Sequence, residues 1–327
     1  MNAERILLER LRSGPATGDA LAGPGQTRAS VWKRVQALRA AGVAIDAVPG
    51  RGYALAQPVD LLDADAITAR LAPGTRARLA SLEVAWSIDS SNSELLRRPA
   101  RCDDRAEVLL AERQSAGRGR RGRAWTTPLA AQVALSAARG FAGGLARLGG
   151  LSLVAGVASV EALHALGATA VRLKWPNDLV VADGAVLRKL GGLLVEGAGE
   201  HAGPARAVVG LGLNVRMPAT AMEGIDQPWT DLAHCMPVPP ARDALAAALV
   251  DAWLHAFDAF ERDGLAPVLA RYARIDALAG RAVRVQAGEG VFEATACGLG
   301  DDGALQVRDA GGALRTVHSG EVSVRAA

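Results

Sequence analysis

Residues 117–125 read GRGRRGRAW, the stretch that says most about the fold and chemistry of the chain. Its three glycines leave backbone N–H groups able to approach a ligand, and its four arginines can donate paired hydrogen bonds to a phosphate or a carboxylate. The Gly-Lys-Ser/Thr ending of a Walker A loop is missing. The alternative is an Arg-Gly segment that is unstructured or binds RNA, but Trp125 argues against it because an aromatic ring there can cover a purine. The stretch therefore predicts an anion-binding loop.

Strand-like and helical patterns alternate on both sides of this loop. Short apolar runs predict strands, and longer runs with helical spacing predict helices. The expected strands are 82–88, 106–111, 132–137, 170–174, 179–181, 190–196 and 207–215, and the expected helices are 145–166, 241–262 and 265–273. The alternation predicts an α/β domain with one main sheet over residues 60–272.

Lysine is rare in this chain, because only Lys33, Lys174 and Lys189 occur among 37 basic residues. Arginine supplies the general positive charge, so a lysine is expected where a compact, rotatable ammonium is needed. Lys174 begins the sequence KWPND, which closes an expected strand with a turn. Lys189 begins KLGGLLVE, where paired glycines allow close backbone approach. Both segments are typical of turns that form sites, whereas GLGLNV at 210–215 is a weaker signal that sheet packing can explain.

The first 57 residues hold the excess positive charge. They carry eight Lys and Arg against four Asp and Glu, which leaves 29 basic and 30 acidic residues for the rest of the chain. Three short helices and a hairpin with a turn at 49–52 are expected here. This order predicts a winged helix-turn-helix, with a dimerisation module as the alternative. The residues expected to face DNA are Arg28, Ala29, Lys33, Gln36 and Arg51.

The last part of the chain, 275–327, loses the helical period. Short strands are expected at 282–286, 290–299, 304–309, 313–318 and 322–325, separated by glycine-rich turns. They predict a small SH3-like β-barrel. The chain has three cysteines without a Cys-x-x-Cys pair, no secretory signal and no apolar run of about 20 residues, which together predict a cytoplasmic protein. The patterns described above divide it into three expected domains, 1–57, 60–272 and 275–327.

Together these segments resemble the biotin–protein ligase family, in its bifunctional form that is both biotin–acetyl-CoA-carboxylase ligase and biotin operon repressor. The segments that carry the resemblance are 117–125, 174–178, 189–196 and 210–215, with DSSN at 89–92 and SGEV at 319–322. The resemblance implies a mixed sheet of the class II synthetase type. It also implies conversion of biotin and ATP to biotinyl-5′-AMP, and transfer of biotin to a lysine of the biotin carboxyl carrier protein. Mg²⁺, operator DNA and a homodimer formed with the adenylate are expected as well.

The resemblance also implies a role for particular residues. The catalytic residues would be Lys189, Arg118 and Arg120, where Lys189 neutralises the biotin carboxylate and the α-phosphate. The biotin-binding residues would be Ser90, Ser91, Asn92, Gln114, Gly117, Arg118, Gly119, Arg120, Lys189, Gly192 and Asn214. The ATP-binding residues would be Arg120, Arg121, Arg123, Trp125, Lys174, Asn177 and Asp178, with Asp178 as the expected carboxylate for Mg²⁺. Ser91 departs from the threonine common in the family but keeps the hydroxyl.

Two other functions remain open from the sequence. A lipoate–protein ligase shares the adenylate chemistry, but its usual Arg-Arg-x-x-Gly-Gly-Gly loop is not present here. A transcription factor that senses biotin without ligase activity would have no need to neutralise an α-phosphate, so Lys174 and Lys189 argue against it.

Overall fold

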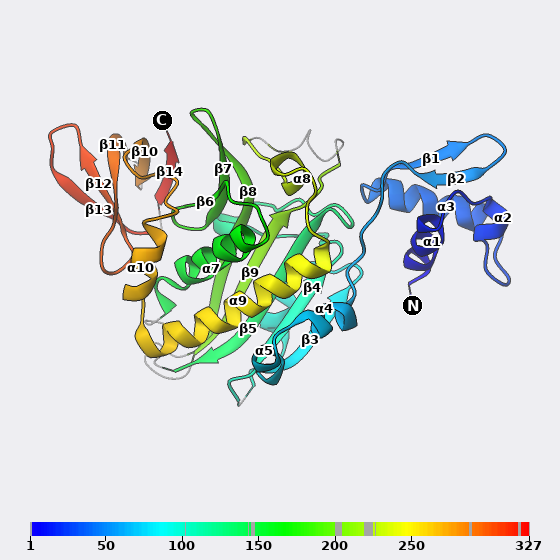
Figure 1. Cartoon of the computed structure of the whole chain (residues 1–327), viewed down its shortest axis with the longest axis horizontal. Coiled ribbons are helices and arrows are strands. Elements are labelled where there is room, and N and C mark those ends of the chain that lie inside the picture. The colour runs from blue at the N-terminus through cyan, green and yellow to red at the C-terminus, as the bar shows by residue number, and fades with distance from the viewer. Residues whose placement is uncertain are drawn as a thin grey trace.

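The computed structural model describes residues 2–101, 103–142, 144, 148–199, 205–218, 225, 227–287, 290–319 and 322–326. Figure 1 shows three parts along the long axis: helices with a hairpin at the N-terminal end, a large sheet with helices in the middle, and a small sheet at the C-terminal end. This order agrees with the prediction, while the domain boundaries given above remain predictions. No helix in the described ranges is both long and apolar enough to cross a bilayer.

The N-terminal part has the predicted winged helix-turn-helix arrangement. Its elements are α1 (Ala3–Arg12), α2 (Gly18–Leu21), α3 (Arg28–Ala40), β1 (Ile45–Val48) and β2 (Gly52–Leu55), and the two strands are antiparallel. Thr27 caps α3 by accepting a hydrogen bond from the backbone N–H of Ser30, and the Ser30 hydroxyl in turn accepts one from the N–H of Thr27. The inner face of α3 consists of three fully buried residues, Val31, Val35 and Leu38.

The middle part is a seven-stranded mixed sheet, as expected. The strands are β3 (Leu79–Ala85), β4 (Ala106–Ala111), β5 (Gln132–Phe141), β6 (Val171–Lys174), β7 (Asp178–Asp183), β8 (Val186–Gly199) and β9 (Ala205–Asn214). Their order is β3-β4-β5-β9-β8-β7-β6, and the β3–β4 pair is parallel whereas the others are antiparallel. β5 and β9 lie in the interior of this order and pair along ten residues each.

Helices cover both faces of this sheet. Alternate strand residues point to opposite faces, so Leu110 and Leu135 enter the main core beneath α7 (Leu151–Ala165) and α9 (Arg242–Asp263). On the other face Leu109 and Val208 pack against Leu95 of α6 (Ser91–Arg97). The remaining helices are α4 (Ala64–Arg70), α5 (Pro73–Ala77), α8 (Leu232–Cys235) and α10 (Ala266–Tyr272).

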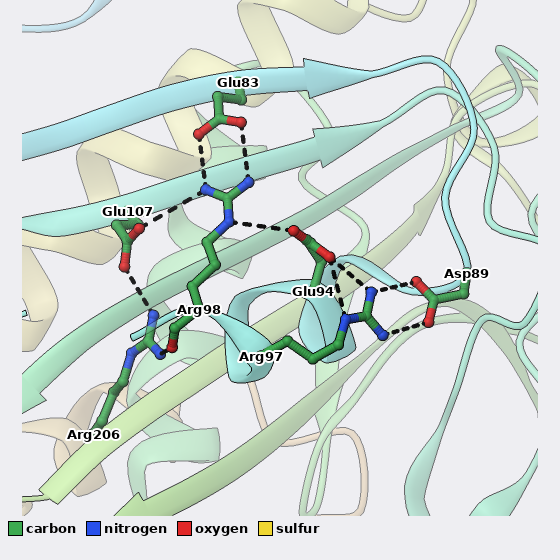
Figure 2. A network of polar contacts seen from close by, with 7 residues as sticks. All are labelled: Glu83, Asp89, Glu94, Arg97, Arg98, Glu107 and Arg206. Carbon is green, nitrogen blue, oxygen red and sulfur yellow. Dashed lines mark hydrogen bonds and ion pairs between the residues drawn. The ribbon is translucent and has the colours of Figure 1, made fainter. Parts of the chain in front are cut away.

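A polar network braces α6 against the edge of the sheet, as Figure 2 shows. The Arg98 guanidinium contacts Glu83 and Glu107, and Arg206 of β9 donates to Glu107 at 2.8 Å. At the other side of the helix Arg97 contacts Asp89, and this ion pair holds the pKa of the Asp89 carboxyl well below its usual value. The contacts of Arg98 therefore tie the C-terminal end of α6 to β3, β4 and β9.

One ion pair is buried in the middle part. Arg242, at the start of α9, donates to Glu112 at 2.7 Å, and the two side chains are only 2% and 0% exposed. The same guanidinium donates to the carbonyl oxygens of Gln132 and Asp60, and the N–H of Leu62 donates to Glu112. The pair therefore ties the segment that follows the N-terminal part to both the sheet and α9.

The N-terminal part docks onto the segment that follows the 117–125 loop. Leu129 is 4% exposed and belongs to the core of the winged helix-turn-helix, and its N–H donates to the Ala41 carbonyl at 2.8 Å. Trp86, after β3, donates from Nε1 to Glu4 of α1 at 3.0 Å. The first two parts therefore share a packed contact.

The C-terminal part contains the predicted short strands. They are β10 (Ala282–Ala287), β11 (Gly290–Leu299), β12 (Leu305–Asp309), β13 (Leu314–Val317) and β14 (Val322–Ala326), in the antiparallel order β13-β12-β11-β10-β14. In the described residues no hydrogen bonds join β13 to β14, so the ladder is not closed into a full barrel. Val283 and Leu305 continue the main core, and Trp175 Nε1 donates to the Gly303 carbonyl at 3.0 Å.

Some predicted bounds differ from those of the structure. The strand expected at 82–88 is β3 at Leu79–Ala85, and the one expected at 190–196 is the inner part of the longer β8. The helix expected at 145–166 is α7 at Leu151–Ala165, and residues 145–147 lie outside the described residues, as do Gly320 and Glu321. The sequence analysis did not predict α4, α5, α6 or α8, which are all short helices.

Candidate active site

Residues 90–92 lie where α6 begins, on the face of the sheet that α6 covers. Ser90 is the N-cap, and its hydroxyl accepts from the N–H of Ser93 at 3.4 Å. The N–H and the hydroxyl of Ser91 both donate to Gln114 Oε1, at 2.8 and 3.0 Å. Gln114 Nε2 in turn donates to the Thr127 hydroxyl at 3.3 Å. The predicted Ser90, Ser91 and Gln114 are thus brought together.

Asn92 is fixed by partners on both ends of its amide. It is 4% exposed, its Oδ1 accepts from the Ser136 hydroxyl at 2.6 Å, and its Nδ2 donates to Glu196 at 2.9 Å. A Cβ at Gly210 would lie 2.3 Å from Asn92 Oδ1, so only glycine lets α6 approach β9 this closely. The amide therefore has one orientation, set by β5 and β8.

The 117–125 stretch forms a small hairpin. The N–H of Trp125 donates to the Gly117 carbonyl at 2.8 Å, and the N–H of Gly119 donates to the Arg123 carbonyl at 2.7 Å. Arg121 sits at the tip with a φ of 59°, in the left-handed region. The stretch folds back on itself as a hairpin, and the N–H of Gly119 is used within it rather than left free for a ligand as expected.

Two arginines of the hairpin contact the body of the site, and two lie at its exposed tip. Arg118 donates to Glu196 at 2.9 Å, and Arg120 donates to Asn177 Oδ1 at 3.1 Å and to the carbonyl of Ser319. Burial lowers the pKa of the Arg120 guanidinium, and the nearby charge of Asp178 partly offsets this decrease. Arg121 and Arg123 are exposed to solvent, so the hairpin presents charge on both of its sides.

Lys189 lies at the centre of the remaining site residues. Its Nζ is 2.8 Å from Asp178 Oδ1 and 5.3 Å from the centre of the Trp125 ring, within the range of a cation–π contact. A Cβ at Gly192 would lie 3.1 Å from Lys189 Cε, so the glycine leaves room for the lysine. The structure thus joins the hairpin, β7 and β8 around one ammonium.

The Trp125 ring lies against β9. A Cβ at Gly212 would come within 2.2 Å of Trp125 Nε1, and that nitrogen donates to Gln132 Oε1 at 3.1 Å. Gln132 Nε2 donates to Asn214 Oδ1 at 2.7 Å, and Asn214 Nδ2 donates to the carbonyl of Thr230. Asn214 therefore orients Gln132, which holds the indole.

The KWPND turn joins β6 to β7. Lys174 and Asp178 face each other in the β6–β7 register, and the N–H of Asn177 donates to the Lys174 carbonyl at 3.2 Å. Asn177 Nδ2 donates to the carbonyl of Leu193 at 2.7 Å. This places Asn177 and Asp178 beside Arg120 and Lys189, whereas Lys174 lies opposite Asp178 on β6, the edge strand of the sheet.

The described residues contain no group of three or more His, Cys, Asp or Glu that could enclose a metal ion. Magnesium in nucleotide sites is commonly held by one or two carboxylates together with phosphate oxygens and water. Asp178 is a single carboxylate beside the arginine-bearing hairpin, so the residues present fit an ion that would be carried mainly by the phosphates of a nucleotide.

Sequence reasoning missed three polar residues of the site, Gln132, Ser136 and Glu196. In the β5–β9 register Gln132 pairs with Asn214 and Ser136 pairs with Gly210, so these residues lie on one face. The available signal was the two-residue period of β5. Every second residue of this strand lies on the face of the site, and these residues are small or polar. The sequence analysis gave the expected strand at 132–137 no role in the site.

The predicted DNA-facing residues lie on α3 and the hairpin turn. Arg28, Ala29, Lys33 and Arg51 are exposed and Gln36 is partly exposed, although the Arg28 guanidinium is paired with Asp19. The sequence analysis missed Trp32, which is also on α3 and is 54% exposed. The helix carries four basic residues and no acidic one, which suits a polyanion.

Three family models match this chain in the order of its parts. They are an HTH domain at residues 4–54, the biotin/lipoate A/B protein ligase family at 88–214 and the biotin protein ligase C-terminal domain at 279–325. A biotin protein ligase from Aquifex aeolicus, in complex with biotin and ATP, has the same fold, with a TM-score of 0.64 at 24% identity. The match covers 76% of this chain and 100% of that one.

Two curated relatives are similar in sequence. The chain is 38% identical to the bifunctional ligase/repressor BirA of Salmonella typhimurium over 96% of this chain and 93% of that protein. It is also 38% identical to a biotin–acetyl-CoA-carboxylase ligase of Mycobacterium tuberculosis, over 52% of this chain and 61% of that protein. The resemblance seen in the motifs is confirmed: the chain belongs to the family of bifunctional biotin ligase/repressor proteins.

Proposed function

We propose that this protein activates biotin with ATP to biotinyl-5′-AMP and transfers the biotin to a lysine of the biotin carboxyl carrier protein of acetyl-CoA carboxylase. The observation that carries the proposal is the position of Lys189. Its ammonium lies 2.8 Å from Asp178 and 5.3 Å from the Trp125 ring, next to the hairpin that bears Arg118 and Arg120. A site of this kind can hold two anions together.

The first step needs placement and charge neutralisation more than proton transfer. An oxygen of the biotin carboxylate attacks the α-phosphorus, and the bond from that phosphorus to the bridging oxygen breaks, so that pyrophosphate leaves. Lys189 neutralises the carboxylate and the α-phosphate oxygens, and Arg118 and Arg120 assist from the hairpin. One such donor contributes about 2.7–4 kcal/mol in the transition state. Asp178 would hold Mg²⁺, and the ion would supply further positive charge at the phosphates.

The neutral ureido ring of biotin needs paired donors and acceptors rather than charge. We assign its recognition to Ser90, Ser91, Asn92 and Gln114 together with the hairpin backbone at Gly117 to Gly119. Support comes from the hydrogen bonds that already join Ser91 to Gln114 and fix Asn92. The biotin side of the site is completed by Lys189, Gly192 and Asn214.

The nucleotide is assigned to the other side of the hairpin. We assign the cover of adenine to Trp125, and the hydrogen bond by which Gln132 orients its ring supports this role. The phosphates are assigned to the remaining ATP-site residues, which are Arg120, Arg121, Arg123, Lys174, Asn177 and Asp178. In the second step the ε-amine of the carrier lysine attacks the carbonyl of the mixed anhydride, AMP leaves, and the amine loses a proton to solvent.

We propose that the N-terminal part represses a biotin operon by binding operator DNA. One winged helix reads a half-site, so a homodimer formed with the adenylate is the proposed DNA-binding form. The exposed basic face of α3 supports this role. The reaction is assigned to the cytoplasm.

The deciding test is mass spectrometry of the small molecules bound to the purified protein after incubation with biotin and MgATP. The expected product is the AMP ester of biotin, and its absence would refute the proposal. Exchange of labelled pyrophosphate into ATP, measured with biotin and with lipoate, separates the two ligases. Exchange with lipoate alone would identify a lipoate ligase.

A further inference from the structure

Glu196 belongs to none of the residue sets assigned above, yet it lies inside the site. It is on β8, its side chain is 23% exposed, and one carboxylate oxygen accepts two hydrogen bonds. The donors are Asn92 Nδ2 and the Arg118 guanidinium, both at 2.9 Å. A single carboxylate therefore joins the start of α6 to the start of the 117–125 hairpin.

The Asn92 contact sets the direction of a buried amide. Ser136 occupies Asn92 Oδ1, so Nδ2 must point toward β8, where it meets Glu196 at 2.9 Å and the Leu194 carbonyl at a longer 3.3 Å. Glycine at position 210 brings the amide this close to the sheet. Without the carboxylate the amide keeps only the longer of its two acceptors.

The Arg118 contact holds the hairpin at its base. The backbone of Arg118 is paired with that of Ala124, and its side chain, 42% exposed, reaches back to Glu196. The two residues that Glu196 joins thus come from the two segments assigned to the ureido ring. Their spacing decides whether donors and acceptors meet the ring together.

The negative charge of Glu196 bears on its role, because the proposed substrates are also anions. The site binds a substrate carboxylate and a triphosphate, so an additional negative charge in it opposes binding unless a cation neutralises it. Arg118 is that cation. A carboxylate in this position must make favourable interactions that offset the electrostatic repulsion. The two hydrogen bonds that Glu196 accepts are such interactions.

We infer that Glu196 is a positioning residue for biotin. It holds the Asn92 amide and the Arg118 segment at the separation that the ureido ring requires, and it does not take part in the attack on the α-phosphate. The inference rests on the proposed biotin ligase function, so its test must separate the two.

The experiment compares the full-length wild type with Glu196→Ala and Glu196→Gln. Calorimetry gives the Kd of biotin without ATP, and adenylate formation gives kcat and the KM values of biotin and ATP. For Glu196→Ala we expect the Kd and KM of biotin to rise by about tenfold, with kcat and the KM of ATP nearly unchanged. Glu196→Gln should recover most of the biotin affinity, because its amide oxygen can still accept from both donors.

Glu107 offers a matched control, since it is a carboxylate on the same sheet that is also held by an arginine. It is 13% exposed, and it joins Arg206 to the Arg98 network at the C-terminal end of α6, as Figure 2 shows. Glu107→Ala should lower the Tm without changing the KM of biotin. An equal rise of that KM in Glu107→Ala would overturn the inference, because general loosening of the sheet would then explain the effect.

Two further results would also overturn it. One is an unchanged biotin Kd in Glu196→Ala. The other is a fall in kcat and Tm with the KM of biotin unaltered, which is the result of a purely structural role. A wild-type protein that neither binds biotin nor forms the adenylate would instead refute the proposed function itself.

Discussion

Replacing Lys189 by alanine tests the proposed chemistry most directly. The change removes an ammonium that is 2.8 Å from Asp178, and both side chains are only about one-fifth exposed, at 19% and 22%. It therefore removes one positive charge and also leaves the Asp178 carboxylate unpaired where the α-phosphate is expected. At about 2.7–4 kcal/mol for one transition-state donor, adenylate formation should slow by about 10²–10³-fold.

Biotin binding should respond much less, because its ureido ring is assigned to Ser90–Asn92 and Gln114. The assay is single-turnover formation of the AMP ester, followed by mass spectrometry, alongside calorimetry of biotin without ATP. Arg188→Ala is the matched control, since Arg188 precedes Lys189 on β8 and makes only a surface ion pair with Asp183. Equal losses of biotin affinity and of rate in Lys189→Ala would refute the reasoning and favour a biotin sensor.

Three other predictions follow from the same structure. Gly212→Ala must displace the Trp125 indole. If that ring covers adenine, the KM for ATP should rise by roughly tenfold or more in steady-state kinetics, and an unchanged KM argues against this role. Arg242→Ala leaves the buried Glu112 unpaired, so urea unfolding should show a loss of about 3–5 kcal/mol, and a loss below about 1 kcal/mol contradicts it. Lys33→Ala should weaken DNA binding at all sequences and reduce the salt slope of log K by about 1, whereas an unaltered slope excludes a phosphate contact.

Local chemistry explains what could be predicted from the sequence. The Thr27 cap and the buried row of Val31, Val35 and Leu38 depend on residues within one helix, so periodicity is enough to find them. The hairpin at 117–125 and the turn at 174–178 are also local. Their closeness in space, which brings Arg120 to Asn177, is a property of the whole sheet.

The residues that were missed depend on contacts between distant strands. Ser136 becomes a site residue only because β5 pairs with β9, which sets it beside Gly210 and below Asn92. A central strand buried on both faces reads as a continuous apolar run, so a lone serine or glutamine in it looks like packing. Trp32 was missed for another reason, since helical spacing alone does not tell how much of a large side chain stays exposed.

The ion pair between Lys189 and Asp178 has a consequence for the enzyme itself. A mixed anhydride reacts with free amines, and Lys174 and Lys189 are the two side-chain amines among the residues assigned to the proposed site. A protonated nitrogen has no electron pair to offer, and contact with a carboxylate at 2.8 Å keeps its hydrogens engaged. With only three lysines in 327 residues, the protein also presents few other acceptors to its own intermediate. Self-acylation is thereby disfavoured both by protonation and by scarcity.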